Sequence, residues 1–183
     1  MKIIAVKSSP RKNGNTNAII ERILEGAEEN GHHILRYDLE NMNFKGCSAC
    51  RACKENGSFC VIKDDLTHYW EELISADVLI WGSPNYMGTI NGTLKTFIDR
   101  HYCTKDKSMK SKLQPGRKAI MVLSQGHSDS SYYLDNYRFL EKYLKTHEMN
   151  VDMVIHSGHT HASQDKELMD KTYQMGKALS DNE

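Results

Sequence analysis

The sequence lacks both an excess of charge of one sign and a long uninterrupted apolar run. Its 183 residues include 24 lysines and arginines and 24 aspartates and glutamates, so the formal net charge is zero. Nucleic acids and anionic membrane surfaces select strongly basic faces, and we therefore expect neither as a partner. No apolar stretch follows a basic start, and charges interrupt every later one. We therefore expect no signal peptide, no transmembrane span and a cytoplasmic location.

Disulfide bonds are also not expected to hold this chain together. A chain of this length can bury roughly 70% of the surface that it exposes when unfolded. It can therefore form one compact domain over residues 1–183 without covalent cross-links. The five cysteines are an odd number, and four of them lie within fourteen residues. Without an export signal, such crowding indicates metal binding or redox chemistry before it indicates a disulfide framework.

Short apolar runs alternate with longer amphipathic segments along the whole chain. The apolar runs predict strands at residues 3–6, 33–39, 78–81, 118–123 and 151–155. The amphipathic segments predict helices at residues 15–29, 64–75, 92–100, 131–146 and 166–179. This alternation predicts an α/β domain with a five-stranded parallel sheet, helices on both faces and the doubly wound order 2-1-3-4-5 of flavodoxin-like folds. In that order a ligand binds beyond the carboxyl ends of the strands, between the first and the third.

Hydrogen-bond donors crowd the loop after the first strand. Residues 8–16 read S-S-P-R-K-N-G-N-T, and a predicted helix follows at once. Free N–H groups at a helix start favour the binding of a phosphate. Neutral donors are added by Ser9, Asn15 and Thr16, and Arg11 adds a charged, forked donor. Simple helix capping by Asn15 or Thr16 is the alternative, but it does not explain so many donors. The loop lacks the glycine patterns of nucleoside triphosphatases and dinucleotide domains, and no acidic cluster typical of response regulators is present.

The loops after the first and third strands together resemble those of the NAD(P)H-dependent FMN reductase and iron–sulfur flavoprotein group. The first is similar to G-S-P-R-x-x-G-N-T, with Ser8 in place of the usual glycine. The second, P-N-Y-M-G, precedes a helix reading L-K-T-F-I-D-R and is similar to P-x-Y-x-[GS] followed by L-K-x-F-[IL]-D-R. The resemblance implies that the FMN phosphate is held by Ser9, Arg11, Asn15 and Thr16. It implies that the isoalloxazine contacts Pro84, Asn85, Tyr86 and Met87, which offer apolar surface and backbone groups.

A third contact is expected after the fourth strand, at Ser124, Gly126 and His127. The group usually has a small glycine-containing loop here, and this version is less typical. His127 would donate to the flavin or to a substrate; the alternative is a solvent-exposed loop histidine. Three histidines past the fifth strand have no acidic or cysteine partners nearby in the sequence and are expected to be solvated loop residues: His156, His159 and His161. Asp99 and Arg100, which end the second motif, are expected to form a local ion pair.

Four cysteines form the pattern C-x-x-C-x-x-C-x6-C at Cys47, Cys50, Cys53 and Cys60. Thiolates at this density suit a [4Fe-4S] cluster or a tetrahedral zinc. The pattern resembles the iron–sulfur flavoprotein motif, but flavin-only relatives retain several of these cysteines and the following Asp-Asp, so a loop of reduced thiols stays open as an interpretation. Cys103 is expected to be isolated and structural. Residues 41–63 are too long for an ordinary connection, and we expect them over or beside the flavin crevice of their own or a neighbouring subunit.

The sequence thus predicts an FMN-dependent oxidoreductase that uses NAD(P)H to reduce a second acceptor. The acceptor is a quinone, a nitroaromatic, a flavin, a metal ion or a redox protein. Because the cofactor performs the chemistry, no general acid or base is assigned. The resemblance and the uncharged loop at residues 84–90 predict a homodimer. The alternative is a non-enzymatic electron-transfer flavoprotein that carries a [4Fe-4S] cluster, and NAD(P)H consumption distinguishes the two.

Overall fold

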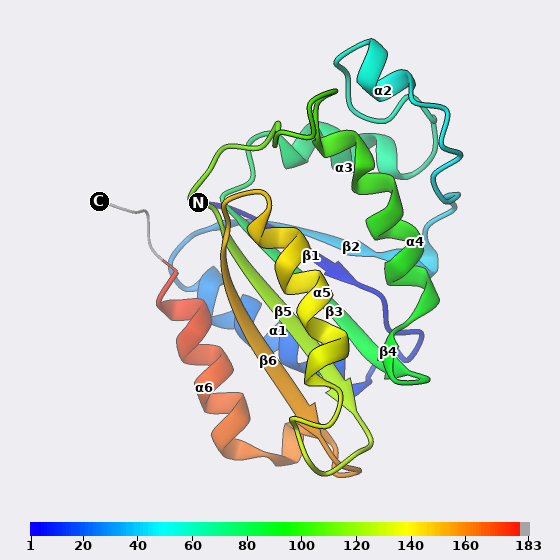
Figure 1. Cartoon of the computed structure of the whole chain (residues 1–183). Helices are drawn as coiled ribbons and strands as arrows, with labels where there is room; N and C mark the ends of the chain where they lie inside the picture. Colours follow the sequence, from blue (N-terminus) through cyan, green and yellow to red (C-terminus); the bar gives the residue numbers. More distant parts are fainter. Residues whose placement is uncertain (180–183) are drawn as a thin grey trace.

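Five parallel strands form the centre of the computed structural model, which describes residues 1–179 (Figure 1). They are β1 (Lys2–Lys7), β2 (His33–Asp38), β3 (Val78–Tyr86), β5 (Lys118–Gln125) and β6 (Asn150–Ser157). Their order in the sheet is β2-β1-β3-β5-β6, which confirms the predicted order 2-1-3-4-5. The last four residues of the predicted single domain, 180–183, lie outside the described residues.

Strand β3 is longer than the sequence predicts. Its parallel pairing with β5 continues to Pro84, which lies opposite Ser124. Its last two residues, Asn85 and Tyr86, then pair antiparallel with β4 (Thr89–Ile90), a short strand that the prediction missed. The Gly82-Ser83-Pro84 stretch, predicted to end the strand, is therefore extended backbone, and the chain turns only after Tyr86.

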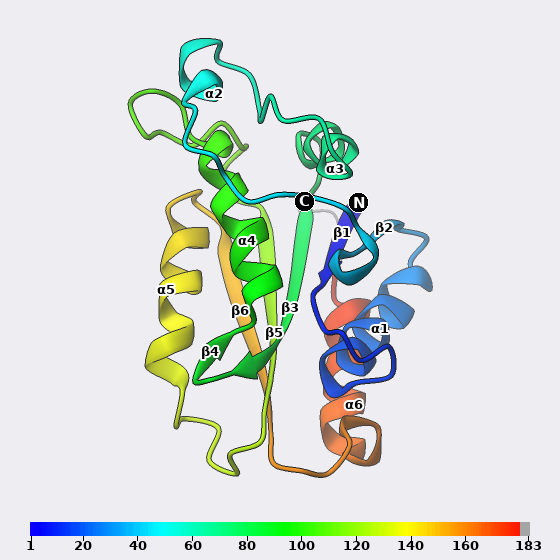
Figure 2. The same cartoon turned by 90° about the vertical axis from the view of Figure 1, so that its right-hand side faces the viewer.

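Helices cover both faces of the sheet, as predicted (Figure 2). Helices α1 (Asn15–Glu28) and α6 (Lys166–Lys177) lie on one face, and α4 (Gly92–Arg100) and α5 (Leu134–Lys145) lie on the other together with α3 (Leu66–Leu73). Short helical turns not predicted are α2 (Ala52–Glu55), η1 (Leu39–Asn41), η2 (His101–Thr104) and η3 (Ala162–Gln164). Within residues 1–179, no helix is long and apolar enough to span a membrane.

Two apolar layers separate because successive strand residues point to opposite faces. In β1, Ile3 and Ala5 are buried against α1, whereas Ile4 and Val6 are buried in the layer that contains α3, α4 and α5. All four side chains are fully buried. Continuous apolar runs of this kind are typical of parallel strands covered on both faces, which explains why the strand positions were readable from the sequence.

Helices α1 and α6 pack at unusually short range. A Cβ atom built on Gly176 would lie 1.9 Å from the carbonyl oxygen of Ile23, and one built on Gly26 would lie 2.2 Å from the carbonyl oxygen of Tyr173. Both approaches are far inside van der Waals contact, so only glycine allows the two backbones to meet here. This contact holds α6 on α1 and so supports the helix whose first turn borders the candidate site.

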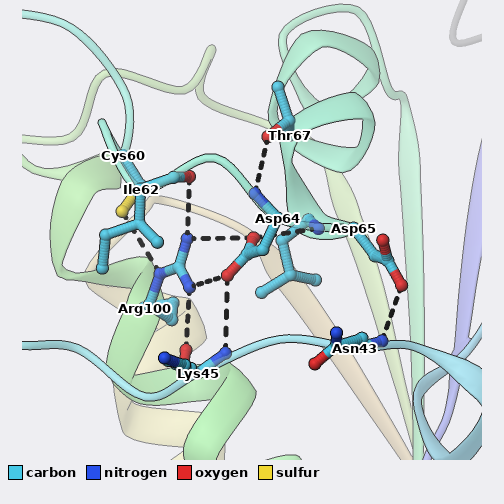
Figure 3. Close-up of polar contacts among 9 residues, drawn as sticks. Asn43, Lys45, Cys60, Ile62, Asp64, Asp65, Thr67 and Arg100 are labelled. Atoms are coloured by element: carbon cyan, nitrogen blue, oxygen red, sulfur yellow. Dashed lines mark hydrogen bonds and ion pairs between the residues drawn. The ribbon is translucent and has the colours of Figure 1, made fainter.

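The excursion after β2 lies at the other end of the molecule from the carboxyl ends of the strands. Both views place α2, which belongs to this excursion, beyond the amino end of β3 (Figures 1 and 2). Its two ends are joined to each other: the backbone N–H of Asn43 donates to the Asp65 carboxylate at 2.6 Å, and that of Lys45 donates to the Asp64 carboxylate at 3.4 Å (Figure 3). The segment between them is therefore a closed loop with a narrow base.

Candidate functional site

A cavity of about 350 Å³ opens at the carboxyl ends of β1, β3, β5 and β6. It lies at the switch point between β1 and β3, where doubly wound sheets bind ligands. A larger cavity of about 750 Å³ lies near the amino ends of the strands, beside Asp77 and Lys118, but none of the predicted ligand motifs reaches it. The smaller cavity is lined by Ser9, Arg11, Asn13, Gly14, Asn15, Pro84, Asn85, Tyr86, Ser124, Gln125, Gly126, Gly158, His159 and His161. No carboxylate is among them.

The first loop presents uncapped backbone donors to this cavity. Helix α1 begins after Gly14, which has no side chain to cap it, and its first turn contains no acidic residue. The loop is shaped by its own bonds: the Gly14 N–H donates to the Arg11 carbonyl at 2.9 Å, and the Arg11 N–H donates to Ser9 Oγ at 3.3 Å. The guanidinium of Arg11 has no hydrogen-bond or ion-pair partner among residues 1–179. The loop therefore offers N–H groups and one uncommitted positive charge, which suits an anion.

Asn91 joins the first loop to the second, and the sequence analysis did not assign it a role. Its Nδ2 donates to the Ser8 carbonyl at 2.5 Å, and its Oδ1 accepts from Ser8 Oγ at 2.9 Å and from the Leu94 N–H at 3.1 Å. The same Oδ1 also accepts from Ser83 Oγ at 3.2 Å. Asn91 thus caps α4 while it holds the two loops together. An asparagine directly before a helical apolar face is an N-cap signal that identifies such a residue in a sequence.

The second loop is a tight hairpin at the edge of the cavity. Asn85 Nδ2 donates to the Tyr137 hydroxyl at 2.7 Å, and that hydroxyl donates to Gln125 Oε1 at 3.1 Å, so Asn85 anchors the loop to α5 and β5. Tyr86 lines the cavity and is 46% exposed as a residue. Met87 occupies the turn with a φ of 51° and is fully exposed. The hairpin therefore presents two apolar side chains, Tyr86 partly and Met87 fully exposed among the described residues.

The third loop contacts the first through hydroxyl groups. Thr16 Oγ1 and Ser124 Oγ lie 2.7 Å apart, and both residues are buried. His127 stacks on Tyr132, with ring centroids 3.9 Å apart and planes inclined by 15°, and it does not line the cavity. Its Nδ1 accepts from the Asp129 N–H at 3.1 Å. The solvent-exposed alternative for His127 therefore describes its position in the single chain.

A fourth loop, after β6, completes the cavity and was missed as part of the site. Gly158, His159 and His161 line it. The structure corrects the interpretation of the three histidines: His156 is buried within β6, and only His159 is strongly exposed. The signal available in the sequence was topological, because a loop after a neighbouring parallel strand opens at the same edge of the sheet.

Most of the predicted FMN contacts are brought together by the fold. Those that line the cavity are Ser9, Arg11, Asn15, Pro84, Asn85, Tyr86, Ser124 and Gly126. Those that do not line it are Thr16, Met87 and His127. The individual roles of all these residues stay predictions.

All five cysteines border a second, much smaller cavity, and all five are free thiols. This corrects the expectation that Cys103 is isolated. Arg100 lies at the same place with its side chain fully buried: its Nε donates to Cys60 Sγ at 3.2 Å, and its guanidinium pairs with the Asp64 carboxylate at 2.6 Å (Figure 3). The predicted Asp99–Arg100 pair is therefore wrong, because Asp99 pairs with Lys95 on the helix surface. A buried guanidinium finds its partner across the loop rather than beside it in the sequence.

The cysteines as they lie do not form a site for a [4Fe-4S] cluster. Within residues 1–179, no three histidine, cysteine, aspartate or glutamate side chains are arranged to hold a metal ion. The cavity that the cysteines border has room for about one water molecule as they lie. Burial also raises the pKa of the Cys103 thiol to about 12, so this thiol is protonated at neutral pH.

The cysteine-rich segment does not cover the candidate site of its own chain. None of residues 41–63 lines the cavity. Helix α4 separates the two places, because Asn91 contacts the first loop at one end and Arg100 contacts Cys60 at the other. Nine helical residues span about 13 Å. The prediction is therefore wrong for the same chain, and a position beside a neighbouring subunit's crevice stays a prediction.

Comparison with known proteins places the chain in a family. The model of the NADPH-dependent FMN reductases matches residues 1–160. An iron–sulfur flavoprotein of Methanosarcina thermophila is 32% identical over 151 residues, which cover 82% of this chain and 76% of that protein. One of Methanocaldococcus jannaschii is 35% identical over 100 residues, 55% of this chain and 51% of that protein, so the match spans about half of this relative.

Among solved structures, an NAD(P)H:quinone oxidoreductase from Methanothermobacter marburgensis shares the fold. Its TM-score is 0.78 at 19% identity, and the alignment covers 100% of this chain and 98% of that one. The fold, the order of the loops around the cavity and the match over residues 1–160 agree. The chain belongs to the NADPH-dependent FMN reductase family.

Proposed function

We propose that this protein binds FMN in the cavity at the carboxyl end of the sheet and acts as an NAD(P)H-dependent oxidoreductase on a second acceptor. The observation that carries the proposal is a cavity without carboxylates into which the uncapped start of α1 and the uncommitted Arg11 are directed. A phosphate monoester carries close to two negative charges at neutral pH. It would satisfy the free N–H groups of the helix start and the charge of Arg11 together.

The residues of the four loops hold and orient the ligand. Ser9, Arg11 and the first turn of α1 bind the phosphate, and the hairpin at Asn85 and Tyr86 supports the flat ring. Asn91 keeps the two loops in register, because its single amide bonds to both. When bound, FMN supplies hydride acceptance from NAD(P)H and electron donation to a quinone, nitroaromatic, flavin, metal ion or redox protein. The chain contributes binding, orientation and exclusion of water.

A homodimer in the cytoplasm is part of the proposal. The exposed Tyr86 and Met87 at the hairpin tip support a dimer, because Tyr86 lines the cavity and both residues are exposed in the part of the chain that the structure describes. A partner subunit on this tip would shield the flavin ring. The five free cysteines support a reducing compartment. Sedimentation that shows only monomer at micromolar concentration would contradict the dimer.

Replacing Arg11 tests the assignment of the cavity. Arg11→Ala should weaken FMN binding by about 1.5–3 kcal/mol, the range for a hydrogen bond to a charged group, and should leave riboflavin binding unchanged. Lys12→Ala is the matched control, because Lys12 is exposed in the same loop but does not line the cavity. Titration of flavin fluorescence measures the affinities. Equal affinity of the wild-type protein for FMN and riboflavin would contradict the phosphate site.

A second candidate function is electron transfer through FMN and a [4Fe-4S] cluster, without a substrate of its own. The observation that favours it is the gathering of five cysteines and the buried Arg100 around one point. We derive no step through a cluster, because the cysteines do not form its site as they lie. Anaerobic protein with about four irons per chain would support this candidate. Steady NAD(P)H consumption by iron-free protein would favour the reductase.

A further inference from the structure

The loop after β6 is built as a fixed wall of the candidate site. Its Gly158 N–H donates to the carbonyls of Gln125 at 3.0 Å and His127 at 3.1 Å, which ties it to the third loop. The N–H of Ala162 donates to Asn15 Oδ1 at 2.9 Å, which ties it to the first turn of α1. The loop therefore bridges the third loop and the phosphate loop, and its intervening residues are held at the cavity.

The two histidines of this loop, His159 and His161, differ in whether their ring nitrogens already have hydrogen-bond partners. In His161, Nδ1 accepts from the Ser163 N–H at 3.3 Å, which leaves the proton on Nε2, and Nε2 donates to the Asn13 carbonyl at 2.8 Å. Both ring nitrogens of His161 are thus committed to holding the loop. In His159, neither ring nitrogen has a hydrogen-bond partner among residues 1–179.

The ring of His159 lies beside Gly126, which has no side chain to occupy that space. A Cβ built on Gly126 would lie 3.3 Å from His159 Cε1 and 3.8 Å from its Nδ1. Gly126 and His159 both line the cavity. Arg11 lies far from them in the sequence but lines the same cavity. Arg11 and His159 are consequently the two side chains of this cavity that carry, or can carry, a positive charge and have no partner in the described part of the chain.

We propose that His159 is a phosphate ligand of the flavin site, a donor from the fourth loop that acts beside Arg11 and selects the phosphorylated flavin over riboflavin. The inference rests on the proposed function, since it needs FMN in this cavity. It adds a residue that no loop motif contains. His161 is its positioning residue, because the bond to Asn13 holds the fourth loop against the phosphate loop.

The test compares His159→Ala with His33→Ala, a control histidine that is exposed at the amino end of β2 and does not line the cavity. At pH 8 the flavin phosphate is a dianion. His159→Ala should raise the Kd for FMN about tenfold, the lower end for a hydrogen bond to a charged group, and should leave the Kd for riboflavin unchanged. His33→Ala should change neither. His159→Gln, which keeps an N–H donor, should restore part of the FMN affinity.

Two further outcomes separate the inference from the proposed function. If wild-type protein prefers FMN and His159→Ala keeps the wild-type Kd, or weakens FMN and riboflavin equally, the role of His159 is overturned and the flavin site stands. If wild-type protein shows no preference for FMN, the phosphate site fails and the inference fails with it. In the double variant of Arg11 and His159, a loss of FMN affinity that differs from the sum of the two single losses would support a shared phosphate, because groups that bind one partner couple.

Discussion

Replacing Arg100 should lower the stability of this fold more than replacing any other single polar side chain. Its side chain is fully buried, and that of Asp64, its partner at 2.6 Å, is only 11% exposed. The guanidinium also donates to the Lys45 carbonyl at 2.8 Å and to the Ile62 carbonyl at 3.4 Å (Figure 3). Arg100 therefore holds both ends of the cysteine-rich segment, residues 41–63, on the last turn of α4.

The substitution Arg100→Met keeps much of the apolar volume but leaves the Asp64 carboxylate without its partner. Removing one member of a buried pair costs about 3–5 kcal/mol, because the remaining charge is desolvated and unpaired. With a urea dependence of about 2 kcal/mol per molar, the unfolding midpoint should fall by about 1.5–2.5 M. Arg100→Lys keeps the charge but not the forked donor. Its unfolding midpoint should therefore lie between those of the wild-type protein and Arg100→Met.

Urea unfolding followed by circular dichroism measures the effect. The matched control is Arg138→Met, because Arg138 pairs with Asp135 at 3.1 Å while both side chains are mostly exposed, and exposed pairs contribute at most about 1 kcal/mol. Adding Asp64→Asn to Arg100→Met removes the orphaned charge, so the double variant should be more stable than the sum of the single losses predicts. An Arg100→Met midpoint equal to that of Arg138→Met, or strict additivity, would refute the reasoning.

Three further predictions follow from buried or crowded residues. Burial lowers the pKa of His101 to about 3 and that of His147 to about 4, whereas an unfolded histidine titrates near pH ~6.5. As the pH falls, the unfolded state therefore binds protons before the folded state does. The free energy of unfolding should fall as pH drops below about 6.5, by about 2 kcal/mol per histidine at pH 5. A His147→Gln variant whose stability depends on pH as the wild-type protein's does would contradict this. Gly176→Ala should lower the melting temperature, because its Cβ would lie 1.9 Å from a carbonyl oxygen of α1 and overpacking costs about 1–3 kcal/mol; Gly92→Ala, whose Cβ meets nothing, should not. Asn91→Ala should destabilise the protein by about 1–3 kcal/mol through loss of the cap and of the loop contacts and should also weaken FMN binding, so full FMN affinity in a destabilised variant would show that the cap alone matters.

Much of the fold could be predicted from local patterns. Residues 3–6 are continuously apolar and residues 15–29 are amphipathic, and each pattern reports only on its own segment. The alternation of such segments then restricts the chain to a parallel sheet with helices on both faces, and the observed order follows. The position of the first loop at the cavity could also be predicted, because its donors are adjacent in the sequence and directly follow β1; their binding of a phosphate stays a prediction.

Contacts between distant segments were decided only by the tertiary structure. Arg100 pairs with Asp64 rather than with the adjacent Asp99, and Cys103 joins the four clustered cysteines although it lies far from them in the sequence. His161 bonds to Asn13 in the first loop, and His159 lines the same cavity, because β6 ends at the same edge of the sheet as β1. Sequence periodicity shows which face of a segment is buried but not which segment covers it. The partner of a buried charge or of a free donor is set only when the segments pack together. Each polar group then loses water and needs another group as its partner.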